Sequence, residues 1–232
     1  MTRIFSRSAA VAAFSVVLIL TVVMITAPTP VRAAADGIDS AKVRIGFDVA
    51  PVPLKLDGLN HADRNLVGYG SYVLNVQSDC NGCHTSSPQA EYAAGGSPYF
   101  SQPTTVNPAA YLSGGSSVGN LPAPPFAEIV SRNLTPDKLG KPAGLTLSEF
   151  LRVIRTGVDM DKWHPTCTGA PNAHCVPSPF DGSLLQVMPW PAFQNMTETD
   201  LVAVYYYLRA IPCLEGDPGN PAGSDTKGTR CQ

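Results

Sequence analysis

The spacing of apolar residues predicts three helices in a chain that is otherwise rich in glycine and proline. In residues 62–78 one helical face carries the positions i, i+4, i+7 and i+8, which are Leu66, Gly70, Val73 and Leu74. Glycine lowers helix propensity, so we expect the glycines of this segment to allow a close crossing with another helix.

Two further helices begin with capping patterns. Thr146 and Glu149 have the spacing of a capping box, and residues 197–200 repeat the pattern with aspartate in the last place. Apolar stripes at helical spacing follow both caps. The first of these helices is expected to end at Gly157, because glycine suits a helix terminus, and the second before Pro212.

Long segments rich in glycine and proline separate these helices. Residues 86–144 contain seven glycines and nine prolines, a density that excludes a long helix or a central strand. Charges are scarce there and aromatic residues are spread through the segment, so we expect an ordered loop wrapped onto an apolar surface. Residues 158–187 are similar. These patterns together predict an all-α fold of about three core helices with long Gly/Pro-rich loops.

The first 35 residues have the pattern of a secretory signal peptide. Arg3 and Arg7 precede an apolar run from Ala9 to Ile25, and three consecutive alanines follow at 33–35. We expect cleavage after Ala35, with Ala33 as the competing site. Retention as a membrane anchor is the alternative. The protein is therefore expected to be periplasmic or otherwise exported, and to meet a membrane only through a retained N-terminal segment or through a complex.

Charge and cysteine content narrow the classes of function. Without the three arginines of the expected signal, residues 36–232 carry 13 basic and 18 acidic side chains, a net charge of about −5. A nucleic-acid-binding protein normally has a basic surplus, so that class of partner is disfavoured. Six cysteines in an exported chain indicate an oxidising compartment.

The candidate chemistry lies in residues 80–84, CNGCH. A zinc site would need a second ligand pair of matching form, which the sequence lacks, and a redox dithiol is expected in a βαβ context. A disulfide between Cys80 and Cys83 would leave His84 without a role. Covalent haem attachment uses all three residues, because the two thiols form thioethers and the histidine binds the iron. One such motif predicts one haem c with its iron.

The second axial ligand of that iron has several candidates. They are Met160, Met188, Met196, His164 and His174. Met188 is favoured, because Pro189 and Pro191 would hold its loop extended and stiff. Met196 directly precedes the helix cap, where its side chain is expected to pack, and Trp190 is placed at the edge of the haem.

The sequence resembles the class I, single-haem c-type cytochromes of bacterial periplasms, and among them the cytochrome subunits of membrane-linked dehydrogenases. The resemblance is carried by GSYVLNVQSDCNGCHT, SRNLTPD, LTLSEFLRVIRTGVD and MPWPAFQNMTETDLVAVYYYLRAIP. These blocks cover roughly a third of the expected mature chain.

The resemblance implies a cytochrome c fold and a set of site residues. Cys80 and Cys83 would be the thioether sites, His84 the proximal ligand and Met188 the distal ligand. The helix before the motif would cross the last helix, with Gly70 and Tyr72 facing Leu201, Tyr205 and Leu208. Asn133 and Thr135, with Tyr72, would lie near the haem edge, where a propionate could accept a hydrogen bond.

The domain boundaries follow from these assignments. We expect a signal peptide at 1–35, an N-terminal extension at 36–60, a cytochrome domain at 61–212 with loop insertions at 86–131 and 158–187, and a tail at 213–232. For the remaining four cysteines we expect Cys167–Cys175 and Cys213–Cys231 disulfides, although sequence alone leaves the other two pairings open.

The function predicted from the sequence is one-electron transfer between redox protein partners, with no catalytic residues. The iron would cycle between Fe(III) and Fe(II) while keeping both axial ligands. Two rivals share the haem but require a displaceable sixth ligand. They are an enzyme acting on peroxide or a small inorganic substrate, and a gas sensor.

Overall fold

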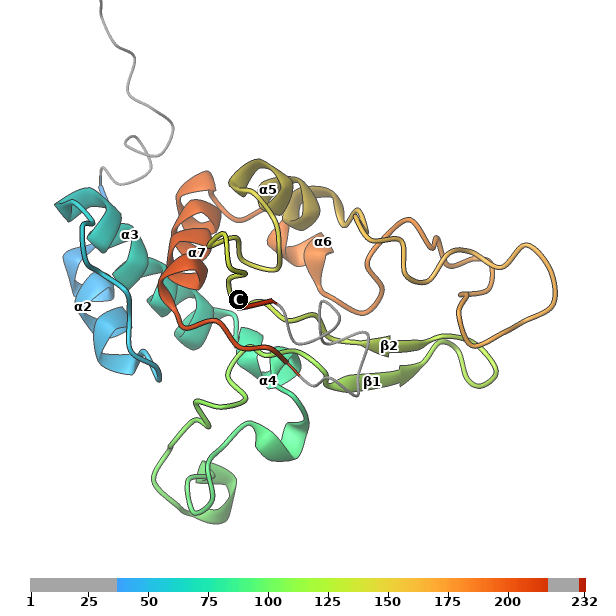
Figure 1. The fold of residues 1–232 in the computed structure, drawn as a ribbon, viewed down its shortest axis with the longest axis horizontal. Coiled ribbons are helices and arrows are strands. Elements are labelled where there is room, and N and C mark those ends of the chain that lie inside the picture. Colours follow the sequence, from blue (N-terminus) through green and yellow to red (C-terminus); the bar gives the residue numbers. More distant parts are fainter. Residues whose placement is uncertain (1–36, 217–229) are drawn as a thin grey trace, which may run out of the picture.

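The structure is a computed structural model, which describes residues 37–216 and 230–232 of the 232-residue chain (Figure 1). The expected signal peptide lies outside the described residues. Within the described residues no helix is long and apolar enough to cross a membrane.

Helices are the main regular elements of the described residues, and long loops connect them. The α-helices are α2 (Ser40–Val49), α3 (His61–Tyr72), α4 (Cys80–His84), α5 (Leu147–Thr156), α6 (Trp190–Phe193) and α7 (Glu198–Ala210), and a π-helical turn η1 (Val73–Gln77) continues α3. Two 3-10 turns, η2 (Pro88–Ala90) and η3 (Pro98–Phe100), lie in the first long loop. The three helices expected from the sequence correspond to α3 with η1, α5 and α7.

Helix α3 lies between α2 and α7 (Figure 1), and glycines allow both crossings. A Cβ at Gly70 would collide with the backbone carbonyl of Ala203 on α7. A Cβ at Gly46 of α2 would collide in the same way with the carbonyl of Gly68. The predicted crossing of the first and last helices is confirmed. The contact of Gly68 with α2 is new, because α2 was expected only as part of an extension.

The crossing uses a different face of α7 from the one expected. Gly70 meets Ala203 and Tyr207, where the small alanine permits close approach. Leu201 and Leu208 instead line a cavity on another side of α7. Helix α7 is therefore buried on several faces, which an amphipathic pattern would not reveal.

Helix α5 begins and ends as its sequence predicts. Thr146 and Glu149 form the capping box, and Gly157 ends the helix in a left-handed conformation (φ 69°). A Cβ at Gly157 would also collide with the indole of Trp190. Phe150 packs against Tyr205 of α7, with ring centroids 5.5 Å apart, so α5 is joined to the same core.

The first long loop is partly buried and contains the only strands described in residues 37–216 and 230–232. Strands β1 (Ser117–Asn120) and β2 (Glu128–Val130) pair antiparallel, a small addition to the expected all-α architecture. Tyr111 is buried and its hydroxyl bonds Asn75 at 2.6 Å and Tyr207 at 2.9 Å. The expectation of a loop wrapped onto the core therefore holds at Tyr111.

At its outer part the same loop departs from that expectation. Tyr99 and Phe100 of η3 are 82% and 76% exposed, on an excursion that leads away from the helices (Figure 1). The aromatic residues of this loop thus divide between the core and the surface, which composition alone could not distinguish.

Both expected disulfides are present. Cys167 is bonded to Cys175, and Cys213 is bonded to Cys231. Cys80 and Cys83 are free thiols. The two cysteines of CNGCH are therefore the pair that is left for chemistry other than a structural disulfide.

Candidate haem site

The CNGCH motif forms α4, a single helical turn set apart from the helix before it. The π-helical turn η1 ends at Ser78, whose N–H donates to the carbonyl of Val73 at 3.0 Å. Asp79 then adopts a left-handed conformation (φ 45°), which short polar residues tolerate better than most. The chain changes direction there, and residues of α4 reach the wall of a cavity.

The imidazole of His84 is oriented by one backbone carbonyl. Its Nδ1 lies 2.7 Å from the carbonyl oxygen of Arg132. A carbonyl can only accept, so Nδ1 carries the proton and Nε2 of the neutral ring keeps its lone pair. Burial lowers the pKa of His84, which also favours the neutral ring. These are the tautomer and the charge state that metal coordination requires.

The two free thiols differ in exposure. Cys80 is partly buried and Cys83 is exposed. Burial raises the pKa of Cys80 to about 12, with the carboxylate of Asp79 adding to the effect. The surroundings of Cys80 therefore favour a neutral sulfur over a thiolate, as in a thioether.

A cavity of about 240 Å³ separates α4 from the loop that carries Met188. Its lining is drawn from α4, β2, α5, α7 and the loop at 158–189, and most of it is apolar. Four of the five candidate second ligands line it. They are Met160, Met188, Met196 and His164. His174, the fifth, is exposed and is not among the lining residues.

The loop before Met188 is held by its own hydrogen bonds. Gln186 donates through its side chain to the carbonyls of Asp181 and Leu184, both at 2.8 Å. Val187 has a positive φ of 68°, which is costly for a β-branched residue and persists only where the surroundings enforce it. The turn at Val187 thus fixes the backbone of Met188 within a continuous stretch of cavity wall at 184–189.

One part of the cavity wall is polar. The guanidinium of Arg132 pairs with Asp159 at 2.8 Å and with Asp161, and it lies 5.1 Å from the ring of Trp163. All four of these residues line the cavity. Arg132 and Asp159 lie in two of the blocks that carry the resemblance, but no motif in the sequence indicated a role at the site for any of the four.

The residues expected at the haem edge lie elsewhere among the described residues. Tyr72 stacks on Tyr69, with centroids 6.5 Å apart. Trp190 packs against Gly157, and Asn133 and Thr135 bond each other and the C-terminal tail. None of Tyr72, Asn133, Thr135 and Trp190 lines the cavity. The structure brings Cys80, Cys83, His84 and Met188 to one cavity and leaves these four outside it.

The residues around the cavity fit a haem. Two free cysteine sulfurs and an oriented, neutral imidazole lie on one turn, and a methionine and further apolar side chains complete the wall. Such a wall suits the apolar macrocycle, and the sulfur and nitrogen donors suit its vinyl groups and its iron. In residues 37–216 and 230–232 no group of three His, Cys, Asp or Glu forms a metal site of its own.

Curated proteins provide distant relatives. An alcohol dehydrogenase (quinone) cytochrome c subunit from Gluconacetobacter polyoxogenes is 27% identical over 147 residues, which are 63% of this chain and 22% of that protein. A fructose dehydrogenase cytochrome subunit from Gluconobacter japonicus is 24% identical over 147 residues, 63% of this chain and 21% of that protein. These relatives are cytochrome subunits of dehydrogenases.

The relatives support a chain of cytochrome c type, and they agree with the prediction of an electron-transfer subunit rather than an enzyme. The chain matches about a fifth of the length of each relative. No family model and no solved structure matches the chain.

Proposed function

We propose that the protein is an exported electron carrier with one covalently bound haem c. Cys80 and Cys83 would form the thioethers, His84 would be the proximal ligand of the iron, and Met188 the distal ligand. A haem bound in this way supplies an iron that changes between Fe(III) and Fe(II) by one electron. The observation that carries the proposal is the bond from His84 Nδ1 to the carbonyl of Arg132, which prepares Nε2 for a metal.

The side chains around the cavity support a carrier in which water is excluded from the ligands. Leu74, Phe150 and Leu201 line the cavity and are buried in the main core cluster. An apolar, low-dielectric surrounding and a methionine ligand both favour the reduced form. The partners would be redox proteins, and a dehydrogenase would be the donor, since the relatives are cytochrome subunits of dehydrogenases.

Carbon monoxide separates a carrier from the two rival functions. If Met188 holds the sixth position firmly, the reduced protein should not bind carbon monoxide rapidly, and Met188→Ala should bind it one to one. Stopped-flow absorbance measures both. Rapid, stoichiometric binding by the unaltered protein would favour the enzyme or the sensor instead.

A further inference from the structure

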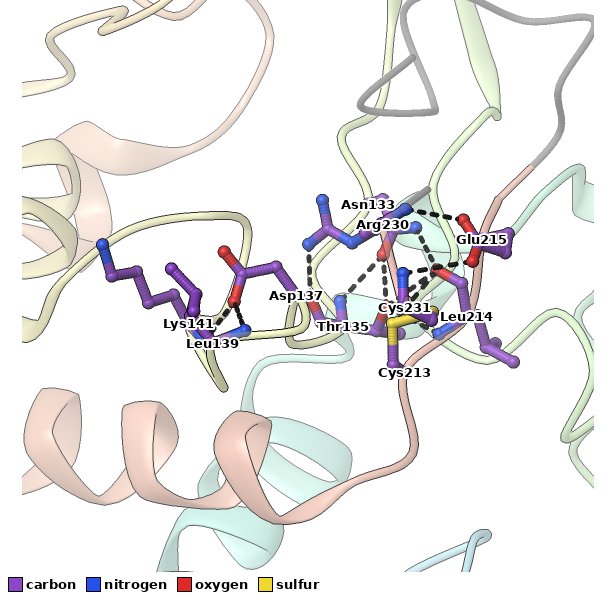
Figure 2. The surroundings of a disulfide bond; sticks show 10 residues. All are labelled: Asn133, Thr135, Asp137, Leu139, Lys141, Cys213, Leu214, Glu215, Arg230 and Cys231. Atoms are coloured by element: carbon purple, nitrogen blue, oxygen red, sulfur yellow. Dashed lines mark hydrogen bonds between the residues drawn. A yellow bond between two sulfur atoms is a disulfide. The ribbon is translucent and has the colours of Figure 1, made fainter. Parts of the chain in front are cut away.

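The end of the chain forms a closed structure against residues 133–138 (Figure 2). The Cys213–Cys231 disulfide joins two segments of the chain. The carboxylate of Glu215 accepts from the N–H groups of Arg230 at 2.9 Å and Cys231 at 3.1 Å. We call residues 213–215 and 230–231 the C-terminal clasp. The two segments of the clasp are thus joined by a covalent bond and by hydrogen bonds.

Both parts of the clasp, residues 213–215 and residues 230–231, form hydrogen bonds with the segment at 133–138. The N–H of Leu214 donates to Oγ1 of Thr135 at 3.1 Å, and Asn133 Nδ2 donates to the carbonyl of Leu214 at 2.9 Å. In the second segment, the backbone carbonyl of Arg230 accepts from the N–H of Lys138 at 2.8 Å. The guanidinium of Arg230 donates to the carbonyl of Thr135. Asn133 and Thr135 are 4% and 0% exposed, so water cannot replace these bonds without opening the contact.

Residues 133–138 directly follow Arg132, whose backbone carbonyl orients His84. Arg132 precedes Asn133, and the peptide between them is rigid and planar, so moving Asn133 moves the Arg132 carbonyl. On its other side this peptide packs against Gly114, where a Cβ would collide with it. Leu134 N–H also donates to the carbonyl of Leu112 at 2.9 Å. The peptide is therefore held between the first long loop and the clasp.

We infer that the C-terminal clasp is a positioning device for the proximal ligand, which it controls through the Arg132 carbonyl. The inference rests on the proposed function. A carbonyl held at 2.7 Å from Nδ1 makes the imidazole a stronger donor to iron and fixes the orientation of the ring. Release of the clasp loosens that bond, which weakens the donor and stabilises Fe(II) relative to Fe(III).

Two independent changes open the clasp without touching a ligand. Cys213→Ser with Cys231→Ser removes the disulfide, and Thr135→Val removes the buried hydroxyl while keeping its shape. In the haem-loaded protein we expect the His84 Nδ1 proton to exchange with solvent at least tenfold faster. NMR of the ferric cyanide complex measures this exchange. We also expect a higher midpoint potential in both variants.

The chain offers a matched control for each change. Cys167→Ser with Cys175→Ser removes the other disulfide, and Thr166→Val removes a hydroxyl that bonds Gly182 at 2.9 Å in the 158–187 loop. Neither control should alter the His84 proton. Equal effects in the controls, or an unchanged His84 proton in both clasp variants, would overturn the inference. An unaltered protein without covalent haem would overturn the proposed function first, and the inference with it.

Discussion

At the scale of single residues, the proposed function depends on which methionine of the cavity wall would bind the haem iron. Met160, Met188 and Met196 all line it. Met188 follows the strained turn at Val187, and the carbonyl of Met188 accepts from the N–H of Trp190 at 2.8 Å, so its backbone is fixed on both sides. Met188 and Met196 both pack against the main core cluster, and Met160 is 37% exposed.

Replacing the methionines one at a time tests this assignment. Met188→Ala should abolish the weak charge-transfer band of methionine bound to Fe(III), because no other sulfur is held in the same position. Met160→Ala and Met196→Ala are the matched controls and should keep the band. Loss of the band in either control, with its retention in Met188→Ala, would move the ligand to that residue. Visible absorption of the oxidised protein measures all three.

Single residues also show which features of the candidate site a sequence pattern can indicate and which it cannot. The CNGCH motif was informative because its chemistry resides in side chains at fixed spacing. The role of Arg132 lies partly in a backbone carbonyl, which every residue possesses, so no sequence pattern could mark it. Asn133 and Thr135 were expected at the haem edge, but the structure bonds them to the tail and they do not line the cavity.

At the scale of elements, glycines determine how closely the helices pack. Gly70 lies where a Cβ would collide with the Ala203 carbonyl, which belongs to the backbone of α7 and cannot rotate away. The crossing of α3 and α7 also places η1 and α4 beside the cavity. The stability of the helical core and the position of the CNGCH motif therefore depend on the same contact.

Gly70→Ala should destabilise the protein by about 2 kcal/mol, the usual cost of forcing an added methyl into a packed core. Gly169→Ala is the control, because a Cβ there meets nothing within 4 Å, and it should change stability by less than about 0.5 kcal/mol. Denaturant unfolding measures the free energy of both variants. Equal stability of Gly70→Ala and the unaltered protein would mean that the crossing is looser than described.

Helices α3, α5 and α7 were predicted, whereas α2 and the short helices α4 and α6 were not. Thr146 with Glu149, and Thr197 with Asp200, form capping boxes that precede α5 and α7, as their spacing indicates. Helix α2 has an N-cap, Asp39, but a glycine, Gly46, interrupts its apolar residues. Its stability comes from packing on Gly68 of α3, a tertiary contact that local patterns do not record.

At the scale of the whole molecule, the segments outside the core helices lie in different places. The 158–187 loop contributes Met160, Trp163 and His164 to the cavity wall, and the outer part of the first loop exposes Tyr99 and Phe100. The tail returns to the segment beside Arg132. Composition predicted that these segments would be loops, but their destinations depend on contacts between residues far apart in the chain.

The most direct test of the whole account is the mass of the protein after denaturation, when expressed with a cytochrome c maturation system. We predict that the processed chain carries the added mass of one haem, which organic extraction does not remove, and that Cys80→Ser with Cys83→Ser loses it. The four disulfide-bonded cysteines should contribute no haem attachment. A denatured chain of unmodified mass, or a haem retained without Cys80 and Cys83, would contradict the account.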